Sequence, residues 1–517
     1  MVARPHHGHF RGRIHHSSGG NNYRQRVLAR DLLPRRSAPG CCRQPGRRRL
    51  GRQHRKLHPN PNLLPSRERG FLHGSSVLPT DEVAYYLENT PKSRALWEEA
   101  CRYLPDGDSR HSIFWKPYPI FTESARGAVV TDADGVERLD FINTMTTMIL
   151  GHGPAPVLEA AREQMELGLA YNSPNRHQVQ LAALLCERIP SFDQVRFTNS
   201  GTEATLNAIR AARAYTGRSK IAKVEGGYHG THDAVMVSLR IDPATGGDYD
   251  SPLPVASSAG LADGTLEQAV IIPYNDVDVA RDILEKHRDE LAAVIVEPVM
   301  GSVGMLPADL SYLKMLRGFA DSSGALLIFD EVISFRVLPG GAQQHYGITP
   351  DMTALGKIIG GGFPVGAFGG RSDIMSLYSP LSGPVINHGG TFNANPVTMA
   401  AGVATLTELT PTVYRRLAEL TEMLRQGVRQ VCSELEQPAQ VTGLGSLFGI
   451  HFTDGQLRNY RDIAAEDKAL GERVFMGMLN EGFLLAPNLV GALSTELGEI
   501  EVDAFVRAFR RVLQRQM

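Results

Sequence analysis

Cysteines and long apolar runs are scarce in this sequence. Only five of the 517 residues are cysteines, and their positions fit neither a metal-binding spacing nor a disulfide framework. No segment approaches the roughly 20 uninterrupted apolar residues that a membrane helix needs. We therefore expect no metal site and no membrane contact, and a reducing compartment, with the cytoplasm as the default location. The cysteines are Cys41, Cys42, Cys101, Cys186 and Cys432.

Acidic residues are almost missing from the N-terminal part of the chain. Residues 1–69 contain 17 Lys and Arg but only two acids, Asp31 and Glu68, so their net charge is +15 in a chain whose total is −1. Without apolar periodicity, residues 1–79 are not expected to fold alone. Three interpretations stay open. A translation artefact is preferred, followed by a mitochondrial or plastid transit segment and then by a basic arm, so no nucleic-acid partner is expected.

The remaining sequence has the pattern of a globular α/β protein. With 42% hydrophobic and 21% charged residues, the chain is long enough for two or three domains. Helical spacing at 80–105 comes first, and the pattern at 127–143 then predicts a hairpin. Helices predicted at 202–216 and 309–322 then alternate with short apolar runs, which predicts a doubly wound, largely parallel sheet. The predicted strands lie in 193–200, 219–226, 268–275, 292–299 and 325–332.

Ligands of such sheets bind beyond the carboxyl ends of the strands, where this sequence concentrates unusual residues. In "FTNSGTEATLNAIRAARAYTG", Ser200, Gly201 and Thr202 stand where a strand ends and a helix begins. Free N–H groups and the helix dipole favour an anion at that point. A capping box formed by Ser200 and Glu203 is the alternative, and we prefer it for this motif taken alone. The Lys-Ser/Thr pair of a nucleotide-binding P-loop is missing.

An aromatic pair follows the second predicted strand. In "EGGYHGTHDA", the two glycines permit close backbone approach, and Tyr228 and His229 offer flat rings on which a planar heterocycle can stack. A plain turn with a core tyrosine explains the same residues, so both interpretations stay open.

Two acids and one lysine stand at later strand ends. Asp330 ends "ALLIFD" and Glu297 ends "AAVIVE", and an acid at such a position is costly to bury without a partner. Asp330 suits a protonated pyridine nitrogen, whereas a cap or salt bridge is preferred for Glu297. Lys357 precedes the glycines at 360–362. Burial lowers the pKa of a lysine and makes it a nucleophile toward carbonyl carbon, although most lysines are simply exposed.

These parts together match one cofactor. An anion site, a ring platform, an acid for a ring nitrogen and an isolated amine suit the phosphate, pyridine ring and aldehyde of pyridoxal 5′-phosphate. Residues from about 90 to 517 resemble the class III, fold-type I pyridoxal-phosphate aminotransferases, in the branch of glutamate-1-semialdehyde aminomutase, with similarity to the β-phenylalanine and other β-amino-acid aminotransferases. The matching stretches are "NSGTEA", "GGYHG", "VEPVMG", "LLIFDEV", "GKIIGGGFPVGAFGG" and "HGGTFNANPVTMAAG".

The resemblance implies a fold and a division of the chain. The fold is a large domain with a mostly parallel seven-stranded sheet and a smaller α+β domain built from both ends of the chain. The division that we expect is a tail at 1–79, an N-terminal part of the small domain at 80–145, a large cofactor-binding domain at 146–390, and a C-terminal small domain at 391–517.

The resemblance also implies roles for single residues. Lys357 would form an aldimine with the cofactor, Asp330 would pair with the pyridine nitrogen, and Tyr228 would stack on the ring, with Val332 on its other face. Thr391 would reach the phosphate of the partner subunit, which implies a homodimer with shared active sites. The remaining residues are the phosphate-binding Ser200, Gly201 and Thr202 and the supporting His229 and Glu203.

The residues expected to bind the substrate distinguish less clearly between an aminotransferase and an aminomutase. "SRHSIFWKPYPI" resembles the segment of β-amino-acid transaminases in which an arginine binds a carboxylate, which points to Arg110; a surface ion pair is the alternative. Near Asn488, however, this chain lacks an arginine that the β-phenylalanine enzyme has. We favour an aminotransferase that moves an amino group from an amino acid, with a β-amino acid as one candidate, to a keto acid. The aminomutase is second and a non-catalytic binding protein third. The substrate-side candidates are Arg110, Glu203 and Glu297.

Overall fold

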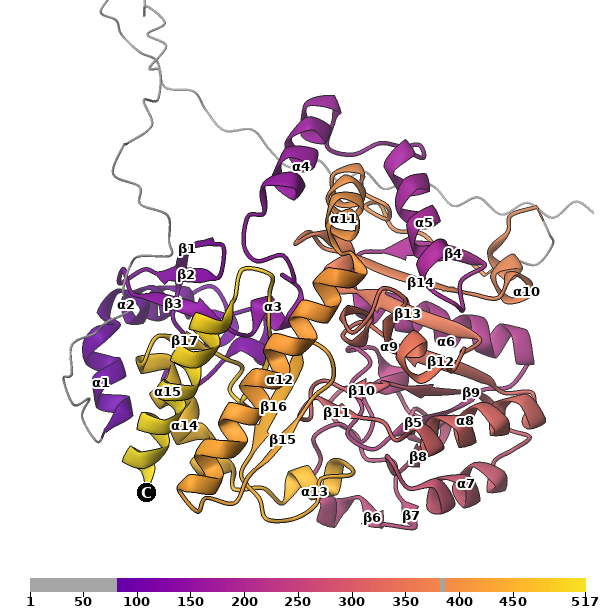
Figure 1. Cartoon of the computed structure of the whole chain (residues 1–517). Coiled ribbons are helices and arrows are strands. Elements are labelled where there is room, and N and C mark those ends of the chain that lie inside the picture. The colour runs from indigo at the N-terminus through magenta and orange to yellow at the C-terminus, as the bar shows by residue number, and fades with distance from the viewer. Residues whose placement is uncertain (1–80, 382–385) are drawn as a thin grey trace, which may run out of the picture. The chain divides into compact units, whose positions relative to one another are not determined.

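A seven-stranded sheet forms the centre of the described chain (Figure 1). The computed structural model describes residues 81–381 and 386–517, so the predictions for residues 1–79 lie outside it. Only β14 runs antiparallel to its neighbours, and the other adjacent strands pair in parallel. The predicted α/β fold with a mostly parallel seven-stranded sheet is therefore confirmed. In spatial order the strands are β4 (Gln194–Thr198), β14 (Gly366–Gly370), β13 (Met352–Gly356), β12 (Leu326–Asp330), β9 (Leu291–Val296), β5 (Lys220–Val224) and β8 (Ala269–Ile272).

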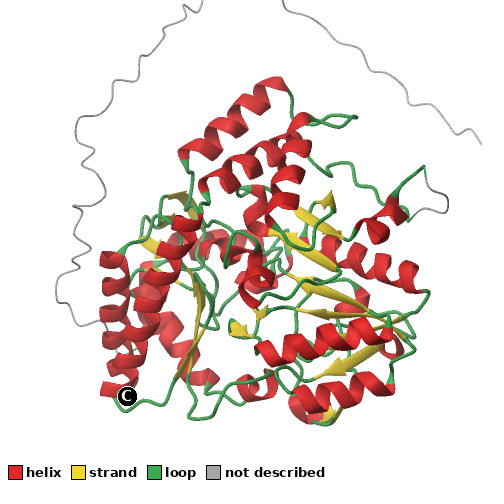
Figure 2. Cartoon of the chain, turned by 45° about the vertical axis from the view of Figure 1, so that its right-hand side comes forward, coloured by secondary structure: helices red, strands yellow, loops and turns green. Residues whose placement is uncertain are grey.

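Helices cover both faces of this sheet, which explains why its central strands are continuous apolar runs (Figure 2). Every residue of β9 and β12 is buried. Along β9, Ala293 and Ile295 pack with residues of α6 (Gly201–Thr216), whereas the alternate residues Val294 and Val296 pack with α7 (Val277–Lys286) and α8 (Leu310–Ser323). This alternation is the two-residue period of a strand buried on both sides.

Strand β14 is rich in glycine, with the sequence GAFGG, and the sequence analysis did not predict it as a strand. A Cβ atom on Gly366 would lie 2.0 Å from the Ser200 carbonyl oxygen, and one on Gly369 would lie 2.5 Å from that of Gln194. The neighbouring strand β4 and the start of α6 therefore approach β14 so closely that only glycine fits at these positions.

Segments from both ends of the chain meet in a second region. The sheet β1–β2–β3–β17 pairs the C-terminal β17 in parallel with β3, and the Arg138 Nε–H donates to the Leu479 carbonyl over 3.0 Å. The predicted hairpin at 127–143 is β2 and β3. The helical spacing at 80–105 corresponds to two helices, α1 and α2, because Pro91 begins a new helix. The elements are α1 (Glu82–Asn89), α2 (Pro91–Ala100), β1 (Thr122–Arg126), β2 (Val129–Asp132), β3 (Glu137–Asp140), α12 (Pro411–Glu434), α14 (Lys468–Asn480), β17 (Phe483–Leu484) and α15 (Glu499–Gln516).

The remaining elements connect these regions or line their edges. A three-stranded antiparallel sheet, β15–β16–β18, lies in the C-terminal part, and α11 packs against α4 and α5. The boundaries predicted at 145/146 and 390/391 stay predictions. These elements are α3 (Asn143–Thr146), α4 (Ala155–Leu167), α5 (Arg176–Arg188), β6 (Gly247–Asp248), β7 (Ser251–Pro252), β10 (Val299–Met300), β11 (Leu306–Pro307), α9 (Gly341–Tyr346), α10 (Ser372–Met375), α11 (Pro396–Glu408), β15 (Gln440–Thr442), β16 (Leu447–His451), α13 (Tyr460–Ala464) and β18 (Val490–Ala492).

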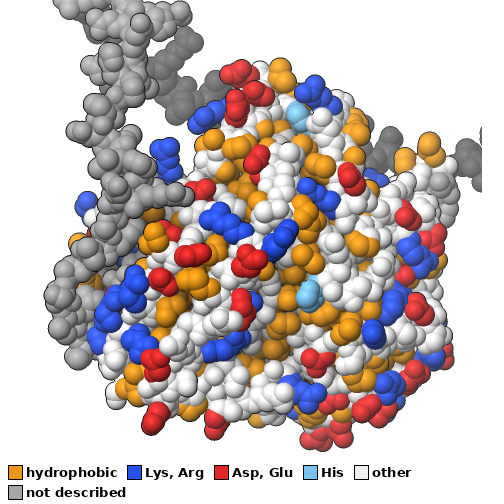
Figure 3. Space-filling model, in the orientation of Figure 1, with side chains coloured by type: hydrophobic (Ala, Val, Ile, Leu, Met, Phe, Trp, Pro, Cys, Tyr) orange, Lys and Arg blue, Asp and Glu red, His pale blue; other side chains and the backbone are white. Residues whose placement is uncertain are grey.

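The surface carries charges of both signs. Figure 3 shows acidic and basic side chains intermixed over the face presented in Figure 1, with apolar side chains between them. None of the helices in residues 81–381 and 386–517 has the length and apolar content that a membrane-spanning segment needs.

Candidate active site

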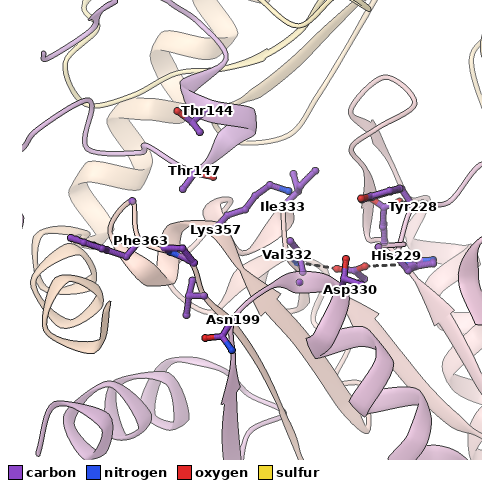
Figure 4. A pocket seen from close by; sticks show the side chains of 17 residues that line it. Thr144, Thr147, Asn199, Tyr228, His229, Asp330, Val332, Ile333, Lys357 and Phe363 are labelled. Atoms are coloured by element: carbon purple, nitrogen blue, oxygen red, sulfur yellow. Dashed lines mark hydrogen bonds and ion pairs between the residues drawn. The ribbon is translucent and has the colours of Figure 1, made fainter. Parts of the chain in front are cut away.

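A cavity of about 360 Å³ lies at the carboxyl edge of the large sheet (Figure 4). Parallel strands end at the same edge, so the residues that follow β5, β9, β12 and β13 are brought together there. Eight of the residues predicted from the sequence line this cavity. They are Gly201, Thr202, Tyr228, His229, Glu297, Asp330, Val332 and Lys357.

Lys357 follows β13 directly and extends into the cavity (Figure 4). Its backbone has φ of +52°, a left-handed conformation that is uncommon for a residue with a side chain and is often found at functional sites. Burial lowers the pKa of its ammonium group, and the nearby Arg336 lowers it further, whereas Asp330 and Glu297 act in the opposite direction. The net result is a lysine that releases its proton more readily than an exposed one.

Asp330, the last residue of β12, forms a buried pair with His229. The His229 Nδ1 lies 2.8 Å from Asp330 Oδ2, and the Val332 N–H donates to Asp330 Oδ1 over 3.1 Å. Burial lowers the pKa of His229, although Asp330 opposes the shift. A neutral His229 that donates from Nδ1 holds the carboxylate in place with its charge facing the cavity. Within the described chain, His229 Nε2 is buried without a hydrogen-bond partner.

Glu297 fixes the loop that carries Tyr228. Its carboxylate accepts hydrogen bonds from the Tyr228 N–H over 2.9 Å and from the Gly301 N–H over 3.0 Å. Burial raises the Glu297 pKa above its usual range, and the charge of Asp330 adds to the rise. These two hydrogen bonds to backbone N–H groups agree with the cap that the sequence favoured for Glu297. Glu297 also lines the cavity.

Tyr228 and Val332 lie on the two sides of Asp330 in the cavity (Figure 4). Tyr228 is 38% exposed, which leaves ring surface open to a bound molecule. Burial raises the pKa of its phenol, and the charge of Asp330 raises it further. The two side chains thus present an aromatic surface and an aliphatic surface to the space above the carboxylate.

The N-terminus of α6 forms another wall. Gly201 and Thr202 line the cavity, and a Cβ atom on Gly201 would lie only 3.0 Å from the Val332 methyl carbons. Ser200 instead caps the helix by accepting from the Glu203 N–H over 3.2 Å. The Glu203 carboxylate in turn accepts from the Asn199 N–H over 2.6 Å. The Ser200 side chain thus caps this 16-residue helix, but the capping box predicted with Glu203 is incomplete, because Glu203 binds the N–H of Asn199 and not that of Ser200.

Some predicted residues lie away from this wall. Arg110, Glu203 and Thr391 do not line the cavity, and Arg110 and Thr391 are exposed. The sequence interpretation also missed several lining residues. Thr144 belongs to a turn in which four consecutive residues have positive φ, from 52° to 72°. No pattern of apolar and polar residues in the sequence predicts such a turn. The missed residues include Thr144, Thr147, Asn199, Ile333 and Phe363.

A comparison with protein families decides the relationship. The model of the class-III aminotransferase family matches residues 114–489. The chain belongs to this family. The predicted resemblance is thereby confirmed.

Relatives with two different names are about equally similar to this class III aminotransferase. The β-phenylalanine transaminase of Variovorax paradoxus is 39% identical over 83% of this chain and 94% of its own length. The glutamate-1-semialdehyde 2,1-aminomutase of Methanocaldococcus jannaschii is 38% identical over 82% of this chain and 98% of its own. Among solved structures, an ω-transaminase from Sphaerobacter thermophilus is 47% identical with a TM-score of 0.80, covering 82% of this chain and 97% of that one.

Proposed function

We propose that this class III aminotransferase transfers an amino group from an amino acid to a keto acid with pyridoxal 5′-phosphate as cofactor. The observation that carries the proposal is one cavity that contains the Lys357 amine, the buried Asp330 carboxylate and the N-terminus of α6. A 39% identical solved structure is described as a transaminase with PLP bound, which supports the same cofactor here.

The donor set of the cavity fits this cofactor. Its volume of about 360 Å³ is within the range of small-molecule sites. Lys357 would hold the aldehyde, and Asp330 the pyridine nitrogen, with the ring between Tyr228 and Val332. The phosphate would lie against Gly201 and Thr202, where free N–H groups favour an anion. When bound, the cofactor supplies an electron sink for the carbon that carries the amine.

The protein side chains then do the proton chemistry. Because burial lowers the Lys357 pKa, its neutral amine is available to take the proton from the substrate carbon that bears the amino group. Asp330 would face the ring nitrogen with a carboxylate that His229 and the Val332 N–H hold in position. Glu297 keeps the Tyr228 loop in position through two backbone N–H groups.

The dimer is part of the proposal. Thr391 is exposed and lies outside the cavity wall, which agrees with a role in the active site of a partner subunit. The neighbouring Phe392 is 60% exposed, and Leu169 is 63% exposed. The two segments are tied together because the Asn395 side-chain amide donates to the Leu169 carbonyl over 2.9 Å. This apolar surface suits burial against a second copy of the chain.

The second candidate is glutamate-1-semialdehyde 2,1-aminomutase, which moves the amino group within one molecule. The specific support is a relative of that name that is 38% identical over 98% of its own length. Both reactions use the same cofactor groups, so the cavity described above supports either.

Absorbance of the purified, cofactor-loaded protein tests the proposal. Excess β-phenylalanine, glutamate or alanine, without an acceptor, should abolish the long-wavelength cofactor band if a donor is accepted. Conversion of glutamate-1-semialdehyde to 5-aminolevulinate, with no response to these donors, would favour the aminomutase. A protein that forms no cofactor band in added pyridoxal phosphate would refute both.

A further inference from the structure

A second cavity of about 590 Å³ adjoins the first one, and we call it the outer chamber. Thr144 lines the first cavity and the next residue, Met145, lines the outer chamber, so one turn forms a wall of both. Ile333 of the first cavity lies against Gly301, whose neighbour Ser302 lines the outer chamber. A substrate whose amine reaches Lys357 can therefore extend its other end into this space.

The outer chamber contains a guanidinium group without a counterion. Arg240 lines it, is exposed, and makes no hydrogen bond or ion pair with any residue of the described chain. Neither acid of the chamber wall forms an ion pair with Arg240 in the described part of the chain. Glu466 pairs with His451 over 2.8 Å, and Asp242 accepts from the Ala244 N–H over 3.0 Å. The charge of Arg240 is thus available to a ligand anion.

Arg240 is also the chamber cation that acts on the reactive cavity. The segment that carries it is hydrogen-bonded to the Tyr228 loop through the Gly226 N–H and the Ser238 carbonyl, and its charge opposes the rise in the Tyr228 pKa. Lys468, the other lysine or arginine of the chamber wall, is instead the first residue of α14, outside that segment. Of the two cations, Arg240 is therefore the better placed to act on a substrate that is held at Tyr228.

The backbone holds Arg240 in a defined position. Arg240 has φ of +46° and Ser238 has φ of +49°, so the segment is sharply turned. On one side, the Gly226 N–H donates to the Ser238 carbonyl over 2.8 Å, which ties the segment to the loop of Tyr228. On the other side, the Tyr460 hydroxyl donates to the Ile241 carbonyl over 2.5 Å. Because hydrogen bonds hold the backbone on both sides of Arg240, binding of a ligand costs less conformational entropy of this segment.

A second polar group in the chamber has no partner. Within the described chain, Ser302 Oγ is buried and makes no hydrogen bond, although such groups are normally paired. Asn488 holds the backbone beside it by donating to the Ser302 carbonyl over 3.3 Å. A hydroxyl donor and a guanidinium together match the oxygens of a carboxylate.

We propose that Arg240 determines substrate specificity by binding the carboxylate of the amino substrate in the outer chamber, with the Ser302 hydroxyl as a second donor. The inference rests on the proposed function, because the amine must lie at Lys357 for the acid to reach this chamber. It differs from the Arg110 prediction, since Arg110 lines neither cavity.

A pair of substrates that differ only in the carboxylate tests this role. Half-reaction kinetics are measured with 3-amino-3-phenylpropanoate and with 1-phenylethylamine on the loaded wild type, Arg240→Ala and Arg240→Lys. The alanine variant should lose roughly ten- to a hundredfold in kcat/KM for the acid, mainly through KM. Its kcat/KM for the amine should not change, which also shows that the variant is folded. Lysine should restore part of the loss.

Two controls separate this role from a general effect of charge. Arg281→Ala removes the same charge from the exposed face of α7, where Arg281 pairs with Asp278, and should affect neither substrate. Lys468→Ala removes the other cation of the chamber and should have the smaller effect on the acid. Equal losses of acid and amine in Arg240→Ala, or no loss at all, would overturn the inference.

Calorimetry keeps the inference separate from the proposed function. Titration of 3-phenylpropanoate, which has no amine, into the loaded protein measures carboxylate binding without any turnover. We expect binding to the wild type and binding at least about tenfold weaker to Arg240→Ala. If the wild type converts neither substrate but this difference persists, the proposed function fails and the carboxylate site stands. If the wild type does not bind the acid, the site is refuted.

Discussion

Single residues of the cavity have properties that their type does not have in water. Lys357 has a lowered pKa because it is buried, and Glu297 has a raised one for the same reason. In each case burial disfavours the charged form. The neutral amine of Lys357 is the form that can attack a carbonyl carbon, so enclosure by the cavity and reactivity have one physical cause.

Replacement of Lys357 by alanine should abolish covalent attachment of the cofactor. Because the amine and the aldehyde condense with loss of water, borohydride reduction of the wild type with pyridoxal phosphate should leave one phosphopyridoxyl group on the peptide that contains Lys357, and the variant should show no such group. Turnover should fall by more than about a thousandfold because the nucleophile and proton acceptor are both lost. Lys220, which is partly exposed and pairs with Glu290, provides the matched Lys→Ala control. A normal rate in Lys357→Ala would refute the role.

At the scale of elements, the glycine-rich strand β14 depends on the absence of side chains. Gly366→Ala would bring a Cβ atom to within 2.0 Å of the Ser200 carbonyl oxygen, at the start of the phosphate-side helix. We expect a loss of about 3 kcal/mol in stability and weaker cofactor binding. Gly318→Ala is the control because nothing lies within 4 Å of its Cβ position on α8, and it should stabilise by about 0.5–1 kcal/mol. Thermal midpoints that change equally in the two variants would contradict this account.

Arg336 joins elements that are distant in sequence. Its fully buried guanidinium donates to the Thr146 carbonyl over 2.7 Å, to the Ser446 hydroxyl over 2.9 Å and to the Leu493 carbonyl. Arg336→Met leaves these acceptors unpaired and should lower the free energy of unfolding by about 3 kcal/mol. Because the Arg336 charge lowers the Lys357 pKa, its removal should also raise that pKa.

The second effect of Arg336→Met is measured in a pH–rate profile of the half-reaction. A higher Lys357 pKa means that the neutral amine forms at higher pH, so the acidic limb of the profile should move to higher pH. Arg281→Met, a change of the same type at the surface, should leave both the profile and the stability unchanged. A shift toward lower pH would contradict the sign of the interaction.

The sequence predicted apolar strands well and glycine-rich or irregular segments poorly. The five predicted strands became β4, β5, β8, β9 and β12 because continuous branched apolar runs are typical of a sheet covered on both faces. In contrast, β14 has little strand propensity of its own and depends on close approach of its neighbours. The same distinction holds in the site. Residues at strand ends were predicted together, whereas Thr144 enters from a turn that only tertiary contacts specify.

At the scale of the whole molecule, buried histidines couple stability to pH. Burial lowers the pKa of His232 to about 4, and the charges of His229 and Arg213 add to the shift. Between pH 6.5 and 4 the unfolded chain takes up a proton that the folded protein refuses, so stability falls as the pH falls through this range. Above about pH 6.5 both forms are neutral and the effect disappears.

The thermal midpoints of the wild type and His232→Gln at pH 7 and pH 5 measure this effect. On acidification from pH 7 to pH 5 the wild type should lose more stability than the variant, by at most about 2 kcal/mol. His287→Gln removes a histidine that pairs with Glu290 near the surface and serves as the comparison. Equal pH dependence in the wild type and His232→Gln would show that His232 is not the titrating group.

The proposed dimer is a further property of the whole molecule. Sedimentation of the wild type should give twice the chain mass of 56.5 kDa. Phe392→Glu places a charge on the exposed apolar surface next to Thr391 and should shift the protein to monomers with reduced turnover. Ile500→Glu, at a residue that is 71% exposed on α15, should leave the mass unchanged. A monomeric wild type with full activity would refute the shared site.

The pairing of β3 with β17 imposes an order on synthesis. Arg138 and its acceptor Leu479 are 341 residues apart. The ribosome must therefore synthesise the intervening chain before this contact can form. At about 5–20 residues per second the delay is roughly 20–70 seconds. The seven strands of the large sheet end at Gly370 and leave the ribosome earlier. During this interval the first strands remain without their partner, so a chaperone that shields them should raise the yield of the native enzyme.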